Sequence, residues 1–165
     1  MRNLADPGFA DDNGAADPEL ASALAAYDAA PEGLHPQTLA VLQHTRLLVP
    51  VIAMLGEVGH DEQGLAYDKT SDMATVLMRG QDGRLALLAF TSTASLRAWN
   101  PEARPVPVPA NQAAQAALHD DAVAVVVDVA GPVLFVIEQD DLRSLAGGYT
   151  LVRMHDRYAW ARTAT

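Results

Sequence analysis

The feature that most limits the fold is a run of small apolar residues, rich in valine, at residues 122–129. It reads Ala-Val-Ala-Val-Val-Val-Asp-Val, with apolar side chains at successive positions rather than at every second one. This pattern is typical of a strand that is covered on both faces. We therefore predict a central strand here, in a sheet that has helices packed against it.

Periodicity and turn signals divide the rest of the chain. Leucines at helical spacing predict helices at residues 18–30, 35–45 and 140–146. An alanine-rich segment that begins with Pro109 predicts a helix at 109–118, and Thr91-Ser92-Thr93 caps a further short helix. Strands are predicted at 46–55, 73–79, 85–90 and 133–138, with a short extended segment at 104–108. This order predicts an α/β fold (α+β-like): a mixed five- to six-stranded sheet with covering helices.

Local signals add detail to this plan. Asp82-Gly83 lies between two apolar runs, which predicts a hairpin of 73–79 with 85–90 and sets Met73 near Phe90. Pro50 lacks a backbone donor, so its strand is expected at a sheet edge or with a bulge. Residues 149–161 fit the spacing of a helix and of a strand equally well.

The chain has the length of one domain. Residues 1–16 are polar and aperiodic, so we expect a flexible N-terminal tail, dispensable for folding through residue 14. The single domain is expected at 17–148, followed by a C-terminal extension at 149–165. No apolar run is long enough for a membrane span, and the N-terminus lacks an apolar signal core, so a cytoplasmic location is expected.

Charge and composition exclude several partners. The formal net charge is -10, which argues against nucleic acid and against an anionic membrane surface. The absence of cysteine excludes disulfides and thiolate chemistry. The C-terminal extension departs from this acidity by mixing bases with aromatics. A packed terminal element or an inter-subunit contact explains that mixture better than RNA binding does. Its residues are Arg153, His155, Arg157, Tyr158, Trp160 and Arg162.

Catalytic and metal motifs are incomplete. Lys69-Thr70 resembles the end of a phosphate loop, but Gln63 and Asp68 stand where that motif needs glycines. Glu57 and His60 have the spacing of a di-iron ligand pair without a second copy, so no metal site is expected. The histidines are scattered, and no cofactor is predicted. A hydrolase site built on Ser71 or Ser92 with a histidine and an aspartate stays open.

One cluster is a candidate ligand site. The predicted hairpin sets the end of the 56–72 loop beside the start of the short helix, whose first backbone amides are a positive helix terminus. A lysine, hydroxyls and such a terminus suit an anionic group of a small molecule or an acidic peptide. The alternative is that Asp72 caps the helix from within. The candidate residues are Lys69, Thr70, Ser71, Asp72, Thr91, Ser92 and Thr93.

The segment Leu88-Ala89-Phe90-Thr91-Ser92, followed by Ala94 to Trp99, resembles a known family. Pro105 to Val108, Ala130-Gly131-Pro132 and Asp140-Asp141-Leu142 extend the resemblance. Together they are similar to the SseB (enhanced serine sensitivity) N-terminal domain family, and 69–73 to its actinobacterial single-domain branch. The departure is Asp128-Val129-Ala130, where many relatives have an asparagine–proline pair. The resemblance implies an α/β fold and carries no established activity, cofactor or catalytic residue.

Three classes of function follow. The first is a non-catalytic binding or adaptor module that recognises a protein or a small anionic ligand, because no acid, base and nucleophile set assembles in the sequence. The second is a hydrolase-like enzyme with an unrecognised Ser/His/Asp site. The third is a structural subunit of a larger assembly, and a homo-oligomer stays open. A deep polar pocket would favour the enzyme, and an apolar surface groove the adaptor.

Overall fold

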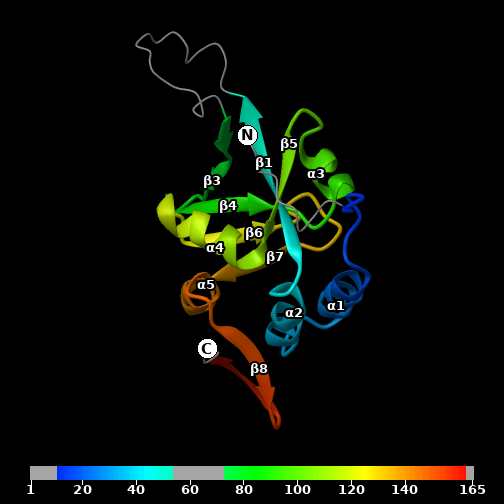
Figure 1. Cartoon of the computed structure of the whole chain (residues 1–165), viewed down its shortest axis with the longest axis vertical. Coiled ribbons are helices and arrows are strands. Elements are labelled where there is room, and N and C mark those ends of the chain that lie inside the picture. Colours follow the sequence, from blue (N-terminus) through cyan, green and yellow to red (C-terminus); the bar gives the residue numbers. More distant parts are fainter. Residues whose placement is uncertain (1–10, 54–72, 163–165) are drawn as a thin grey trace.

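A computed structural model describes residues 11–53 and 73–162 (Figure 1). The helices are α1 (Pro18–Ala29), α2 (His35–Leu42), α3 (Thr93–Trp99), α4 (Ala110–His119) and α5 (Gln139–Ala146). The strands are β1 (Arg46–Ala53), β2 (Met73–Thr75), β3 (Leu77–Arg79), β4 (Leu85–Ala89), β5 (Arg104–Pro109), β6 (Ala124–Val127), β7 (Phe135–Glu138), β8 (Thr150–Met154) and β9 (Arg157–Ala161). None of the described helices is long and apolar enough to cross a membrane.

The valine-rich strand lies inside the sheet, as predicted. β6 runs parallel to β4 and antiparallel to β7 in a sheet of order β3-β4-β6-β7, and all four of its residues are buried. β1 lies in a second sheet of order β2-β1-β5, and a bridge between Leu48 and Phe90 joins the two. The α/β fold is confirmed, whereas the single five- to six-stranded sheet is replaced by these two joined sheets and a separate β8–β9 hairpin.

The predicted hairpin of 73–79 with 85–90 is only partly right. β3 and β4 pair as expected, with Leu77 opposite Leu87. Residues 73–75 instead leave this ladder and pair with β1, where Met73 lies opposite Ala53. The expected proximity of Met73 to Phe90 is therefore wrong. Residues 73–75 pair with β1 instead, and the backbone N–H and C=O of Phe90 are hydrogen bonded to Leu48.

Pro50 lies in a central strand rather than at an edge. The backbone of Leu48 pairs with Phe90, and further along β1 the backbone of Ile52 faces Ala74 of β2. Pro50 falls between these two neighbours, where the ladder passes from one strand to the next. Its missing N–H is tolerated at that break.

Two layers of side chains cover the β3-β4-β6-β7 sheet. Leu87, Val125 and Ile137 point to the face covered by helices, where the alanines of α4 allow close packing. Leu88, Phe90 and Val126 point to the other face, where α3 and β1 supply Leu96 and Leu48. That second cover reaches only part of the sheet.

The C-terminal extension is a hairpin that packs on the core through one face. β8 and β9 are antiparallel, with Leu151 opposite Trp160, so the ambiguous residues 149–161 form strands. The Gln43 side chain binds both the N–H and the C=O of Leu151, at 2.7 and 2.8 Å, as a neighbouring strand would. The indole of Trp160 donates to Asp141 at 3.0 Å, which fixes the hairpin to α5.

Candidate functional site

Asp128 lies just past the end of β6, beside Thr91 at the end of the parallel strand β4. The carboxyl ends of adjacent parallel strands are a common location for functional groups in α/β domains. Asp128 is 1% exposed, and its carboxylate accepts from the Thr91 N–H, the Thr91 hydroxyl and the Ser95 hydroxyl, at 2.8, 2.7 and 2.9 Å. Its φ of 55° is a left-handed conformation that aspartate tolerates better than most residues.

The electrostatics of this cluster fit a structural brace rather than a reaction centre. Burial raises the pKa of Asp128, and the hydrogen bonds from Thr91 and Ser95 oppose that rise without cancelling it. Thr91 and Ser95 are each 4% exposed, so a substrate has no approach to them in this conformation. The carboxylate therefore ties the start of α3 to the end of β6.

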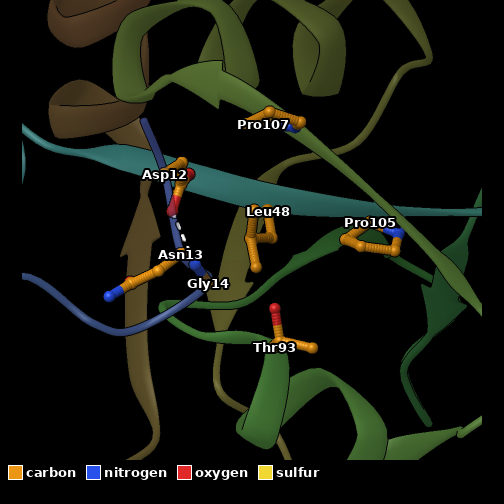
Figure 2. A pocket seen from close by; sticks show the side chains of 7 residues that line it. All are labelled: Asp12, Asn13, Gly14, Leu48, Thr93, Pro105 and Pro107. Carbon is orange, nitrogen blue, oxygen red and sulfur yellow. Dashed lines mark hydrogen bonds between the residues drawn. The ribbon is translucent and has the colours of Figure 1, made fainter. Parts of the chain in front are cut away.

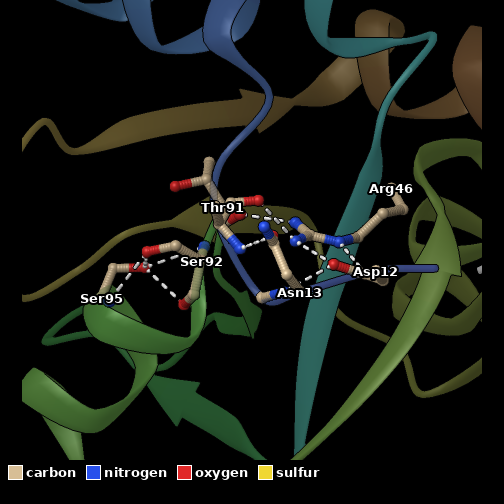
Figure 3. A network of polar contacts seen from close by, with 8 residues as sticks. Asp12, Asn13, Arg46, Thr91, Ser92 and Ser95 are labelled. Carbon is tan, nitrogen blue, oxygen red and sulfur yellow. Dashed lines mark hydrogen bonds and ion pairs between the residues drawn. The ribbon is translucent and has the colours of Figure 1, made fainter.

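Arg46 forms a second brace at the start of β1 (Figure 3). Its guanidinium pairs with both oxygens of Asp12, at 2.6 and 3.0 Å, and donates to the carbonyls of Ala15 and Thr91. The hydrogen bond from Arg46 holds the pKa of Asp12 below its usual range. Residues 12–15 therefore contact the folded domain, which differs from the expectation of a loose tail over 1–16.

Gly14 completes this N-terminal contact. Its carbonyl accepts from the Thr93 N–H at 2.8 Å, and its φ is +84°. A Cβ added at Gly14 would lie 2.4 Å from the Thr93 hydroxyl oxygen. A surface pocket of about 360 Å³ lies beside the contact (Figure 2). Its lining residues are Asp12, Asn13, Gly14, Leu48, Thr93, Pro105 and Pro107.

Gly14→Ala tests whether this segment stabilises the domain. We expect the free energy of unfolding to fall by about 2 kcal/mol, because the new side chain adds both left-handed strain and a clash with Thr93. Gly33→Ala is the matched control, since Gly33 has a φ of +87° and nothing within 4 Å of an added Cβ. Urea denaturation of both variants separates the two effects. Equal losses of unfolding free energy in the two variants would show that the close packing of residue 14 against Thr93 adds nothing to the cost of the substitution.

The candidate ligand site is described only in part. Lys69, Thr70, Ser71 and Asp72 lie outside the described residues. Ser92 caps α3 by accepting from the Ser95 N–H at 3.0 Å, and the Thr93 N–H is held by Gly14. The Thr91 N–H and hydroxyl are bound to Asp128. The Thr91 and Ser92 side chains and the Thr93 N–H thus have internal partners, and the combined anion site stays a prediction.

A broad hollow lies on the uncovered part of the β3-β4-β6-β7 sheet. Ala86 and Ala124 are opposite each other on adjacent strands, and their small side chains leave a groove of about 480 Å³. Met78 and Val123 border it, each 38% exposed. The floor continues through Val126 and Val136, and Asp82, Arg84 and Glu138 stand at the rim.

No pattern in the sequence predicts this groove. Ala86 and Ala124 are ordinary strand residues, and their hollow exists only because the register places them side by side. No group of three or more acidic or histidine side chains within the described residues could hold a metal ion. The lining of the groove is mainly apolar, which suits contact with apolar side chains, and the charged residues at its rim suit contact with polar groups.

The family model of the SseB protein N-terminal domain matches residues 20–144 of this chain. The chain belongs to the SseB family. The match includes the parallel strands β4 and β6, the Asp128 cluster and the groove, and it ends before the β8–β9 hairpin. Comparisons with curated proteins and with solved structures gave no match.

Proposed function

We propose that this SseB-family chain is a non-catalytic binding module that holds a partner protein in the groove at Ala86 and Ala124. The observation that carries the proposal is the character of this groove: it is broad, lies on an uncovered sheet face and has mostly apolar walls. Large exposed apolar side chains beside a hollow are typical of protein–protein contact sites. The proposed partner inserts an apolar side chain between Met78 and Val123.

The hydrolase alternative has less support. In the described structure, Ser92 and Ser95 hydrogen bond to each other, and Ser95 also donates to Asp128. His35 is occupied elsewhere, with its ring stacked on Phe135 and its Nε2 bound to the carbonyl of Val136. These side chains serve packing and capping. The role of a small anionic ligand, the actinobacterial branch and the cytoplasmic location stay predictions.

The experiment is affinity capture from the native host with a charge placed in the groove. Immobilised Met78→Arg/Val123→Arg should lose its specific partner, because two cations in the groove oppose burial of an apolar side chain. The control is Val106→Arg/Leu118→Arg, since these residues are each 37% exposed and lie outside the groove. Quantitative mass spectrometry compares the captured proteins with those of the unchanged chain.

The outcomes separate the binding module from the enzyme. Loss of one partner in the groove variant alone supports the binding module. Identical capture by both variants contradicts it. Hydrolysis of an ester or phosphoester by the purified chain, abolished by Ser92→Ala and unaffected in the groove variant, would favour the enzyme instead.

A further inference from the structure

The strand edges of this protein are not equally protected against pairing with another chain. Leu48 of β1 directs its backbone N–H and C=O toward Phe90 and away from β5. The opposing Pro107 of β5 therefore directs its nitrogen to the outer edge of the sheet, and Pro105 does the same. Proline there has no N–H to offer to an added strand. On β7, His35 binds the outward carbonyl of Val136. On β8, Gln43 occupies the outward groups of Leu151.

The outer edge of β9 differs from these three. Because Leu151 turns its backbone to Gln43, the pair Leu151–Trp160 is of the non-hydrogen-bonded kind. Trp160 therefore directs its N–H and C=O away from β8, and so does Tyr158 two residues earlier. No hydrogen bond to these outward groups occurs within residues 11–53 and 73–162. An open edge of this kind is a template for strand addition.

We propose that β9 pairs antiparallel with β9 of a second copy, with the two-fold axis at Ala159. In this register Tyr158 lies opposite Trp160 of the partner subunit, so the open backbone groups meet as hydrogen-bonded pairs. Two hairpins then form one four-stranded sheet. The hairpin extends from the body beside α5 (Figure 1). Antiparallel pairing therefore sets the two bodies at opposite ends of the four-stranded sheet.

Charge complementarity favours a second copy of this chain as the partner of the β9 edge. The same register places Asp156 at the hairpin turn opposite Arg162 of the partner subunit, and both side chains are exposed. Among the described residues, the guanidinium of Arg162 donates to the Tyr149 hydroxyl and stacks on its ring, and this contact leaves other donors for a carboxylate. Arg157 falls opposite Ala161, so arginines do not meet directly.

The wider charge distribution agrees with this arrangement. Residues 149–165 contain three arginines and one aspartate, a net charge of +2, whereas the rest of the chain carries -12. Antiparallel pairing brings the basic hairpin tip of one copy toward the acidic body of the other, and Asp141 already lies at the base of the hairpin against Trp160. The contact is small, so an affinity in the micromolar range is expected.

The experiment is sedimentation equilibrium of the full chain and three charge variants. Asp156→Arg and Arg162→Asp each oppose like charges across the interface, so each should weaken dimerisation at least tenfold. Asp156→Arg/Arg162→Asp should restore it. Within one copy the two side chains lie roughly 20 Å apart along the strand, so the rescue needs two copies. Arg104→Asp, a change at an exposed position on β5, should leave dimerisation unchanged.

Hydrogen exchange supplies a second readout. The amides of Tyr158 and Trp160 should exchange more slowly as the protein concentration rises, and Arg162→Asp should remove that dependence. A monomer at every concentration overturns the proposal. So does a dimer without the charge rescue, or a different protein bound at β9 while the chain stays monomeric. Because the groove at Ala86 lies on another sheet, its variants do not affect this test.

Discussion

Asp128→Ala is expected to lower the free energy of unfolding by about 3 kcal/mol. The substitution removes the shared acceptor of a buried N–H and two buried hydroxyls, from Thr91 and Ser95. It also leaves alanine in a left-handed conformation, with a φ of 55°. Urea denaturation at neutral pH measures the loss.

Two control variants separate these causes. Asp121→Ala keeps the backbone effect alone, because Asp121 is exposed and has a φ of 65°; about 1 kcal/mol is expected. Asp128→Asn keeps an acceptor oxygen and tolerates the left-handed conformation, so it should cost less than alanine. If Asp128→Ala and Asp121→Ala lose the same free energy, the three hydrogen bonds contribute nothing to stability.

The pH dependence of the same variants has a definite sign. Burial raises the folded-state pKa of Asp128 above its ordinary value of 3.8. Between those two values the folded chain holds a proton that the unfolded chain has lost, so stability falls as the pH rises and is constant above the folded pKa. Asp128→Asn lacks this contribution. The difference in unfolding free energy between the unchanged chain and Asp128→Asn should therefore be most favourable to the unchanged chain in acid.

Asp12 acts in the opposite direction. The hydrogen bond from Arg46 lowers its folded-state pKa, so its contribution is present above the ordinary value and is lost as the pH falls through the folded pKa. Comparison with Asp128→Asn isolates Asp128, because both proteins keep Asp12. An unchanged difference across the acid range would contradict the effect of burial on Asp128.

The sequence predicts those parts of the fold that local patterns encode. β6 was identified because burial on both faces requires apolar side chains at successive positions, and the chain has them at Ala124–Val127. The start of α3 was predicted because Thr91-Ser92-Thr93 is a favourable capping segment, and Ser92 is the residue of that segment that caps the helix in the structure. In each case the residues that form the pattern are also those that make the contact.

The remaining features depend on residues far apart in the chain. Asp128 is visible as an acid after a strand, but Thr91 and Ser95 lie 37 and 33 positions away. The Asp12–Arg46 pair spans 34 positions and begins in an aperiodic segment. β2 separates from β3 at Val76, where neither glycine nor proline marks a break, because β1 offers a second partner. The groove likewise depends on which strands meet.

Val126→Asp is expected to cost about 4 kcal/mol, which is a large share of the stability of a single domain. Val126 is 8% exposed and lies between Leu88 of β4 and Val136 of β7. A carboxylate at this position lies among the apolar side chains of Leu48, Leu88 and Phe90, which offer it no hydrogen bond, and it loses most of its hydration because Val126 is nearly buried on the floor of the groove.

Val123→Asp is the matched control, because Val123 lies three residues earlier and is 38% exposed. Its carboxylate stays hydrated, so a loss below about 1 kcal/mol is expected. Urea midpoints with unchanged slopes attribute the difference to the folded state rather than to residual structure in the unfolded chain. Equal midpoints for the two variants would contradict the enclosure of Val126, since only the loss of water distinguishes the two positions.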